Sequence, residues 1–405
     1  MKLNPEHFFP SAVKLITPLF FVLLCFYHAL TPEGAGDEGL FISDLDYIKS
    51  YGWIAAIEKG IALTYLILAY PLSLIVKNYV ALRITNMLLL LFLFFYFSKW
   101  GSIKNKQFYN YLLLISASGF FLAGTNDTLF IVSMVIFFNE TYKFLEKEEN
   151  SNGSLLLCSV IIAFFTRELI YIYIPLILLS SFLIWKIKGK VWNQWYIPVS
   201  LLITLLVVNM PCIEKNQHIS YDNKNPDSSI KATWVQRQYL AQLLVNDNKI
   251  PNQTHPSWEE TDAYLLKHGE NSLPRTTAEG IFFDFKLTVL EFFKDFSSTV
   301  FLSIRQTGIM YISVIAYLFF AVFQRRINTN LFLPFVGLFV VAVFSFIIIS
   351  FVEGRWLLVS YIVAILYYSN LEVNKKLPQK LILLNHAVLI LVMFYGSFKV
   401  LLKLL

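Results

Sequence analysis

The chain has 405 residues, of which 57% are hydrophobic and 15% are charged. Soluble globular domains hold about 45–50% apolar and about 25% charged residues, so this composition excludes an ordinary soluble enzyme and a disordered chain. It indicates a membrane protein instead. The net charge of +6 comes from 33 Lys and Arg against 27 Asp and Glu, and its meaning depends on where those charges fall.

Eleven apolar runs predict an all-α polytopic membrane protein with about 11 transmembrane helices. In chain order they cover approximately residues 12–30, 82–98, 108–124, 128–143, 154–166, 169–185, 195–211, 304–323, 330–351, 355–370 and 381–401. A further run at 61–76 contains Pro71, and we interpret it as a re-entrant or surface-lying helix.

The positive-inside rule supports that interpretation of residues 61–76. If the run does not cross, the basic clusters all fall on the inner side with the N-terminus, and the C-terminus lies outside. These clusters are Lys99/Lys104/Lys106, Lys143/Lys147, Lys186/Lys188/Lys190, Arg325/Arg326 and Lys375/Lys376/Lys380. A crossing would move all of them to the face opposite Lys2 and Lys14.

The pattern predicts three regions. Residues 1–211 form a transmembrane module whose first outer loop, 31–81, carries membrane-surface helices. Residues 212–303 form a large extracytoplasmic loop region, and residues 304–405 form the C-terminal transmembrane helices. Within the large loop, residues 281–296 show apolar residues at helical spacing between charged ones, which predicts an amphipathic helix on the membrane surface.

Charged residues gather at the outer ends of the predicted spans. Asp37 and Glu38 follow the first span closely, and carboxylates kept beside lipid are functional candidates, although a solvated loop with capping acids is an equal alternative. Arg83, at the start of the second span and one turn inside the outer interface, suits a phosphate clamp or a snorkelling side chain. Asp127 lies in an outer turn at 124–128, where turn chemistry alone also favours Asp.

Two further acid–arginine motifs interrupt apolar runs on the predicted outer side, namely Arg167-Glu168 and Glu353-Gly354-Arg355-Trp356. Each is explained either as a local ion pair or as part of a site. Six of the eight arginines fall outside, against the positive-inside tendency: Arg83, Arg167, Arg237, Arg275, Arg305 and Arg355. This distribution favours an extracytoplasmic site for a lipid-linked phosphate or diphosphate.

The order of these features resembles the GT-C superfamily of membrane glycosyltransferases, which includes protein O-mannosyltransferases, aminoarabinose transferases and dolichol-linked sugar transferases. The resemblance rests on the acidic pair after the first span, the stretch at 47–52, the apolar segment at 60–72, Arg83, the Asn126-Asp127 turn, Arg167, and the late Glu353-Gly354-Arg355-Trp356 element. It covers about residues 10–210 and 330–370, and residues 212–303 match nothing in it.

The resemblance implies inverting transfer of a sugar from a polyprenyl-phosphate donor to an acceptor hydroxyl on the extracytoplasmic face. The richness in Lys, Asn, Ile and Phe with few Arg, and the compact length, favour a bacterial source and hence the inner membrane. The resemblance also implies a catalytic pair of Asp37 and Glu38, with Asp37 as general base. Further residues implied are donor phosphate ligands (Arg83, Arg167 and Arg355) and acceptor- or metal-orienting acids (Asp127, Glu168 and Glu353). A divalent cation, Mg²⁺ or Mn²⁺, is an open expectation, with Asp37 and Asp127 as ligands.

A glycan, a lipid or a protein is expected as the acceptor of the sugar. Membrane lipid is expected as a further partner, and no nucleic acid is expected. The main alternative is an O-antigen-type polymerase or ligase acting on undecaprenyl-diphosphate glycans, which would use Arg237, Arg275, His255 and His268 of the large loop. A non-enzymatic lipid-glycan flippase is the third interpretation, and it predicts charged residues buried along a path through the spans.

Overall fold

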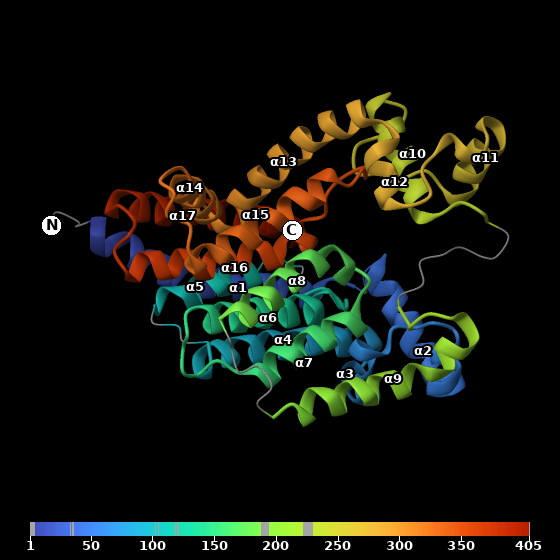
Figure 1. Cartoon of the computed structure of the whole chain (residues 1–405), viewed down its shortest axis with the longest axis horizontal. Coiled ribbons are helices and arrows are strands. Elements are labelled where there is room, and N and C mark those ends of the chain that lie inside the picture. Colours follow the sequence, from blue (N-terminus) through green and yellow to red (C-terminus); the bar gives the residue numbers. More distant parts are fainter. Residues whose placement is uncertain are drawn as a thin grey trace. The chain divides into compact units, whose positions relative to one another are not determined.

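The computed structural model describes residues 5–32, 34, 36–101, 103, 105–117, 119, 121–187, 194–221 and 230–404. Among the predicted inner basic residues, Lys2, Lys104, Lys188 and Lys190 lie outside this described part. Within it, all regular structure is helical, with seventeen α-helices, three short 3-10 helices and no strand (Figure 1). The all-α prediction is confirmed.

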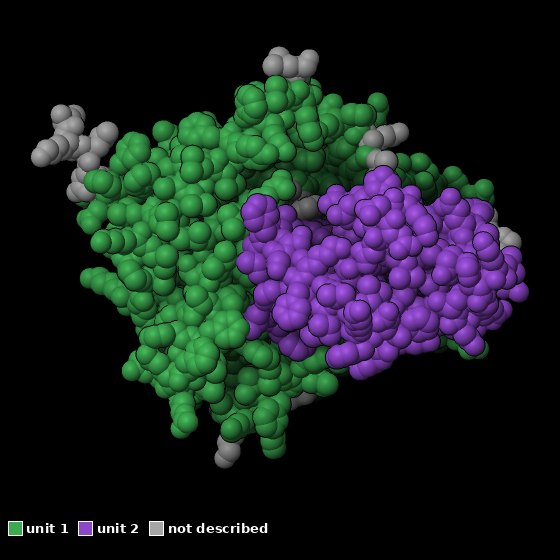
Figure 2. All heavy atoms as spheres, turned by 90° about the horizontal axis from the view of Figure 1, so that it is seen from above, with its two compact units in different colours: residues 1–222, 303–337, 358–405 green, residues 223–302, 338–357 purple. Residues whose placement is uncertain are grey.

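The chain divides into two compact units, coloured green and purple in Figure 2. Unit 1 consists of residues 1–222, 303–337 and 358–405, and unit 2 of residues 223–302 and 338–357. Most of the region 212–303 therefore falls in unit 2, together with a later segment that comes from the predicted C-terminal transmembrane region. The three-region division stays a prediction.

Unit 1 is built around α6 (Asp127–Leu145), whose side chains are almost all buried and which packs against α4, α7, α8 and α16. The polar side chains of α6 are buried with the apolar ones, and Lys143 pairs with Glu140 at 2.8 Å within the helix. The other helices wholly within unit 1 are α1 (Pro5–Leu30), α2 (Asp37–Glu58), α3 (Leu63–Ser73), α4 (Asn78–Lys99), α5 (Gln107–Ser116), α7 (Gly153–Thr166), α8 (Ile170–Lys186), α9 (Tyr196–Asn216), α14 (Met310–Phe323), η2 (Thr329–Leu331), α16 (Leu358–Val373) and α17 (Gln379–Leu404).

Unit 2 has its own small apolar core, in which Tyr239, Leu240, Leu265 and Leu273 are buried together. Its helices are α10 (Trp234–Asn246), α11 (Trp258–His268), η1 (Glu270–Ser272), α12 (Thr277–Phe283), η3 (Gly354–Leu357), most of α13 (Phe285–Thr307) and the second part of α15 (Phe332–Phe346). Both α10 and α11 begin with a capping box, so their starting points are fixed by local sequence.

The helices of unit 1 carry the surface expected of a membrane-embedded protein. Seven helical segments of the described chain are long and apolar enough to cross a membrane. On α1, the large apolar side chains Leu15, Leu19, Val22 and Phe26 recur at helical spacing and are exposed. Such a stripe is unfavourable in water and favourable against lipid. The chain is therefore a polytopic membrane protein, while the count of 11 spans stays a prediction.

Some predicted spans are shorter in the structure. The run 108–124 is helical only in α5, and 304–323 is divided, with α13 ending at Thr307 and α14 starting at Met310. Gly308 between them has φ +59°, and a Cβ there would meet Asn385 Oδ1 at 2.6 Å, so the break suits glycine alone. The predicted surface helix 281–296 is wrong in its limits, because α13 continues to Thr307.

The segment predicted as the first outer loop, 31–81, contains two helices. In α2, Gly52 adopts φ 83° and ψ 173°, so the helix bends there. α3 has 11 residues and, at about 1.5 Å per residue, is too short to cross a hydrocarbon layer about 30 Å thick. The resulting hairpin brings the acidic start of α2 close to α4.

Candidate active site

The acidic pair after α1 lies where the start of α2 contacts α4 and the turn before α6. Glu38 is buried and accepts two hydrogen bonds from Arg83, Nε to Oε1 and Nη2 to Oε2, both 2.8 Å. The backbone N–H groups of Gly34 and Gly124 donate to the same carboxylate at 2.6 Å and 2.9 Å. Burial raises the pKa of Glu38, but these hydrogen bonds and the Arg83 charge outweigh it and leave the pKa lowered.

Arg83 uses all of its N–H groups on protein acceptors. Beside its two bonds to Glu38, Nη1 donates to the carbonyls of His28 (2.7 Å) and Thr31 (2.9 Å), and Nη2 donates to Pro32 (2.9 Å). A guanidinium has five N–H donors, so none is left over in this arrangement. The geometry favours a positioning role, in which Arg83 ties the end of α1 to the start of α2. Its role as a phosphate ligand stays a prediction.

A second buried acid–arginine pair lies at the start of α6. Asp127 contacts Arg167, the residue that caps α7, and Thr125 Oγ1 donates to Asp127 Oδ2 at 3.2 Å. Arg167 therefore pairs across two helices, and its neighbour Glu168 is exposed. The contact with Asp127 is therefore one that adjacency in the sequence did not indicate.

The two pairs are connected through the turn that precedes α6. Gly124 in this turn binds Glu38, and Asn86 on α4 donates to the carbonyls of Ala123 and Thr125, the latter at 3.2 Å. We call Glu38, Arg83, Asn86, Asp127 and Arg167 the loop-1 network. Asn86 was not predicted as a site residue, although its position one turn after Arg83 puts both on one helix face.

Asp37 is the first residue of α2 and is half-buried beside Glu38. Two helical turns further on, Asp44 lies on the same side of the helix. Burial raises the pKa of Asp44 to about 6, against a smaller opposing effect of Lys59. Asp44 is thus a second carboxyl on this helix that can exchange a proton near neutral pH. Its seven-residue spacing from Asp37 is the sequence signal that could have identified it.

The remaining predicted pair, Glu353 and Arg355, lies in unit 2, where the two side chains contact each other directly. This agrees with the local ion pair that sequence alone offered as one alternative. The pair is only partly buried, with the Glu353 side chain 27% exposed. It adjoins residues of the large loop: His255 Nδ1 lies 3.1 Å from Ser350 Oγ, and its ring stacks on Phe351.

The large-loop residues named for the alternative function divide into two groups. Arg237 Nε donates to the carbonyl of Pro256 at 2.7 Å, next to His255 in the chain. Arg275 instead forms an exposed pair with Glu270, and His268 stacks on Tyr264 at the surface. Burial and the Arg237 charge lower the pKa of His255, with Glu353 opposing them. Its ring is therefore neutral near pH 7.

The described residues contain no group of three or more His, Cys, Asp and Glu side chains placed to hold a metal ion. Asp127, one of the two predicted ligands, already contacts Arg167 and Thr125. To bind a cation together with Asp37, Asp127 would have to give up these contacts. The divalent cation therefore stays an expectation, and the proposed reaction does not use one.

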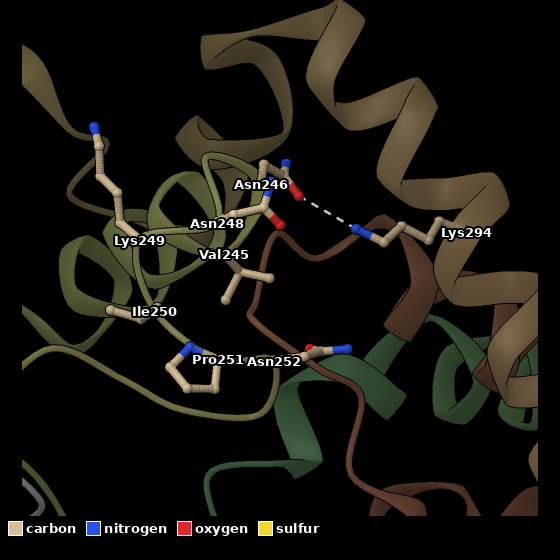
Figure 3. Close-up of a pocket in the computed structure, with 8 residues that line it drawn as sticks. All are labelled: Val245, Asn246, Asn248, Lys249, Ile250, Pro251, Asn252 and Lys294. Atoms are coloured by element: carbon tan, nitrogen blue, oxygen red, sulfur yellow. Dashed lines mark hydrogen bonds between the residues drawn. The ribbon is translucent and has the colours of Figure 1, made fainter.

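An open polar pocket of about 580 Å³ lies in unit 2, and none of the predicted site residues lines it. It is formed by the loop after α10 and by α13, and its amide and ammonium side chains include Asn246, Asn248 and Lys294 (Figure 3). Lys294 Nζ donates to Asn246 Oδ1 at 3.2 Å across its edge. The volume alone does not mark it as the active site, because it holds no paired acid and base.

Comparison with known proteins adds nothing to this geometry: no family model, no curated protein and no solved structure matches the chain.

Proposed function

We propose that this chain is a membrane glycosyltransferase that moves a sugar from a polyprenyl-phosphate donor to an acceptor hydroxyl on the extracytoplasmic face, in a bacterial plasma membrane. The observation that supports this most is the buried Glu38–Arg83 pair, which fixes the first turn of α2. Because Asp37 directly precedes Glu38 and is half-buried, this pair holds a carboxylate in a defined position that a substrate can still reach.

Asp37 acts as the general base in the proposed reaction. It accepts the proton of the acceptor hydroxyl while that oxygen forms a bond to the anomeric carbon of the donor sugar. The bond from the anomeric carbon to the phosphate oxygen breaks at the same time, and the polyprenyl phosphate leaves with the electron pair. A single displacement inverts the anomeric centre.

Glu38, Arg83, Asp127 and Arg167 act in this proposal mainly by positioning. Arg83 and Arg167 already pair with buried carboxylates, and removing either charge would leave an acid uncompensated. Guanidinium groups stabilise the developing charge of a phosphate leaving group, and Arg355 stays a ligand predicted from the sequence alone; its side chain contacts Glu353 within unit 2.

The polyprenyl tail needs an apolar surface, and α3 supplies one in the proposed site. Its side chains Ile67 and Leu68 are exposed, as are Leu74 and Ile75 just after the helix, while Pro71 lies between the two pairs. In a membrane-embedded chain such residues contact acyl chains, and a prenyl chain has the same apolar character.

The test is transfer by the purified full-length protein in nanodiscs, supplied with short polyprenyl-phosphate sugars and glycolipid acceptors. The proposal expects a glycosylated product of inverted anomeric configuration by NMR and equimolar release of polyprenyl phosphate. Release without a new glycosidic bond, or a retained configuration, would contradict the assigned mechanism.

One observation favours the polymerase or ligase as a second candidate: of its four predicted residues, Arg237 and His255 lie close together in unit 2. That function requires a diphosphate-linked glycan donor. It therefore predicts turnover of undecaprenyl-diphosphate oligosaccharides but not of monophosphate sugars, and activity that depends on Arg237 and His255 but not on Asp37.

A further inference from the structure

Unit 2 contains a polar cluster in which α10, the segment 251–257 and the segment 350–355 come together. Its members are Arg237, His255, Ser350, Glu353 and Arg355, and we call them the unit-2 cluster. Ser350 is buried, while the side chains of Arg237 and His255 are half-buried. The cluster therefore combines fixed side chains with access from outside.

Arg237 is held in one orientation but has donors to spare. Its Nε donates to the Pro256 carbonyl at 2.7 Å, and its guanidinium carbon lies 4.8 Å from the centre of the Trp258 ring. These two contacts fix the plane of the guanidinium. No described side chain or carbonyl accepts a hydrogen bond from its two Nη groups, which are the pair that binds an oxyanion in bidentate fashion.

His255 is oriented in a similar way. Its ring stacks on Phe351, with centroids 5.6 Å apart and planes 15° from parallel, and its Nδ1 lies 3.1 Å from Ser350 Oγ. When Ser350 donates to Nδ1, the proton of the neutral ring sits on Nε2, for which the described residues offer no acceptor. His255 then has one N–H donor available beside the guanidinium of Arg237.

The charges around this pair leave the donors of Arg237 unsatisfied without repelling an anion strongly. Arg355 contacts Glu353, and the exposed Glu259 acts on Arg237 only through its charge, with no hydrogen bond between them in the described residues. His255 is neutral near pH 7, because burial and the Arg237 charge lower its pKa. The two cations and two acids balance, so the unused N–H donors rather than a net positive charge favour an oxyanion here. A rigid guanidinium and an imidazole N–H are groups that bind phosphoryl oxygens well.

We infer that Arg237 and His255 form a binding site for the oxyanion of a phosphate ester. The shared chemistry is a phosphoryl group, carried either by a membrane-anchored prenyl phosphate or by a soluble phosphate. The inference concerns binding alone and requires no transfer step. Binding can therefore fail while the proposed transfer reaction holds, and transfer can fail while phosphate binding holds.

Binding is measured by calorimetric titration of the full-length protein in phosphatidylcholine nanodiscs, first with farnesyl phosphate and then with inorganic phosphate. Arg237→Gln is expected to raise Kd about 10–100-fold, since a hydrogen bond to a charged group contributes about 1.5–3 kcal/mol. His255→Phe, which keeps the ring stack but loses the donor, is expected to raise Kd about 3–10-fold. Lys267→Gln removes one exposed positive charge from the same unit and should leave Kd unchanged.

The two ligands distinguish the sources of the phosphate. Both ligands should compete, because both place a phosphoryl group on Arg237 and His255. A clearly lower Kd for farnesyl phosphate supports a lipid-borne headgroup, and similar Kd values support a soluble ester. If Arg237→Gln does not fold, Arg237→Lys replaces it as the test, because it keeps the charge and loses the bidentate fork. Its Kd is expected to lie between that of the wild type and that expected for Arg237→Gln. Absence of binding of both ligands to the wild-type protein, or equal Kd in wild type, Arg237→Lys and His255→Phe, would overturn the inference.

Discussion

Arg83 in unit 1 and Arg237 in unit 2 show two different uses of a partly buried arginine in one chain. Arg83 donates from every N–H group to Glu38 and to carbonyls around the end of α1. Among the described residues, Arg237 donates to one acceptor, the Pro256 carbonyl, and its guanidinium lies over the Trp258 ring. An arginine whose donors are all satisfied by protein holds structure, whereas one with donors in reserve is available to a ligand.

The same contrast applies to the acids. Glu38 is buried and accepts four hydrogen bonds, so its charge is stabilised by fixed dipoles and by one cation. Glu353 is more exposed and contacts a near neighbour in the sequence. The loop-1 network is therefore expected to contribute strongly to stability, and the unit-2 cluster to contribute more to binding.

The largest expected effect on stability is that of Arg83→Ala. It leaves the Glu38 carboxylate buried without its cation, which costs about 3–5 kcal/mol in the free energy of unfolding. Denaturant unfolding in detergent measures the loss. The double variant Glu38→Gln/Arg83→Met should recover part of it, because both charges are then gone. A change of less than about 0.5 kcal/mol for Arg83→Ala would mean that the pair does not hold the loop.

Gly124→Ala tests the network from its other end. An added Cβ would lie 2.6 Å from Leu82 Cβ and 2.8 Å from Glu38 Oε1, so the turn before α6 must move. We expect a destabilisation of about 1–3 kcal/mol and loss of transfer activity. Gly280→Ala is the matched control, because its nearest neighbour would be a Pro274 ring atom at 3.6 Å. Equal behaviour of the two variants would argue against the tight contact.

Asp44 should make stability depend on pH in the direction opposite to a salt-bridged acid. Its pKa is about 6 in the folded chain and about 3.9 when unfolded, so the folded state binds the proton more strongly. The stability contribution of Asp44 therefore falls as pH rises from about 4 to about 6. Asp44→Asn should gain about 1–2 kcal/mol relative to wild type above pH 6, allowing for solvent screening, and nothing below pH 4. A pH-independent difference would contradict the raised pKa.

The smallest effect is expected at Arg275, whose pair with Glu270 is exposed on both sides. Arg275→Ala should change the free energy of unfolding by about 0–1 kcal/mol, because solvent and salt screen such pairs. A loss comparable to that of Arg83→Ala would remove the distinction between buried and exposed pairs on which the comparison rests.

Much of the helix pattern was predictable from the sequence, because apolar runs and their polar breaks are local features. The all-α class and a helix in each predicted span follow from this pattern. The break at Gly308 was not predicted, since it depends on the close approach of Asn385 from α17. The inclusion of residues 338–357 in unit 2 was likewise not predictable from the sequence, because it results from packing between segments distant in sequence.

The site was predictable in its residue types but not in its pairings. Asp37, Glu38, Arg83, Asp127 and Arg167 were all singled out at the outer ends of spans. The structure then shows Arg83 bound to Glu38, 45 residues away, and Arg167 in contact with Asp127 at the start of another helix. Spacing in the sequence cannot reveal such partners, because they are set by which helices pack together.

The most direct test of the account is the transfer rate of Asp37→Asn compared with Glu58→Gln, a matched carboxylate at the far end of α2 that forms an exposed pair with Lys215. Both variants should fold with wild-type stability by denaturant unfolding. The account predicts that Asp37→Asn lowers kcat by about 10²–10⁴-fold, as expected for loss of a general base, while Glu58→Gln stays at the wild-type rate. A wild-type kcat in Asp37→Asn would contradict the assignment of the base.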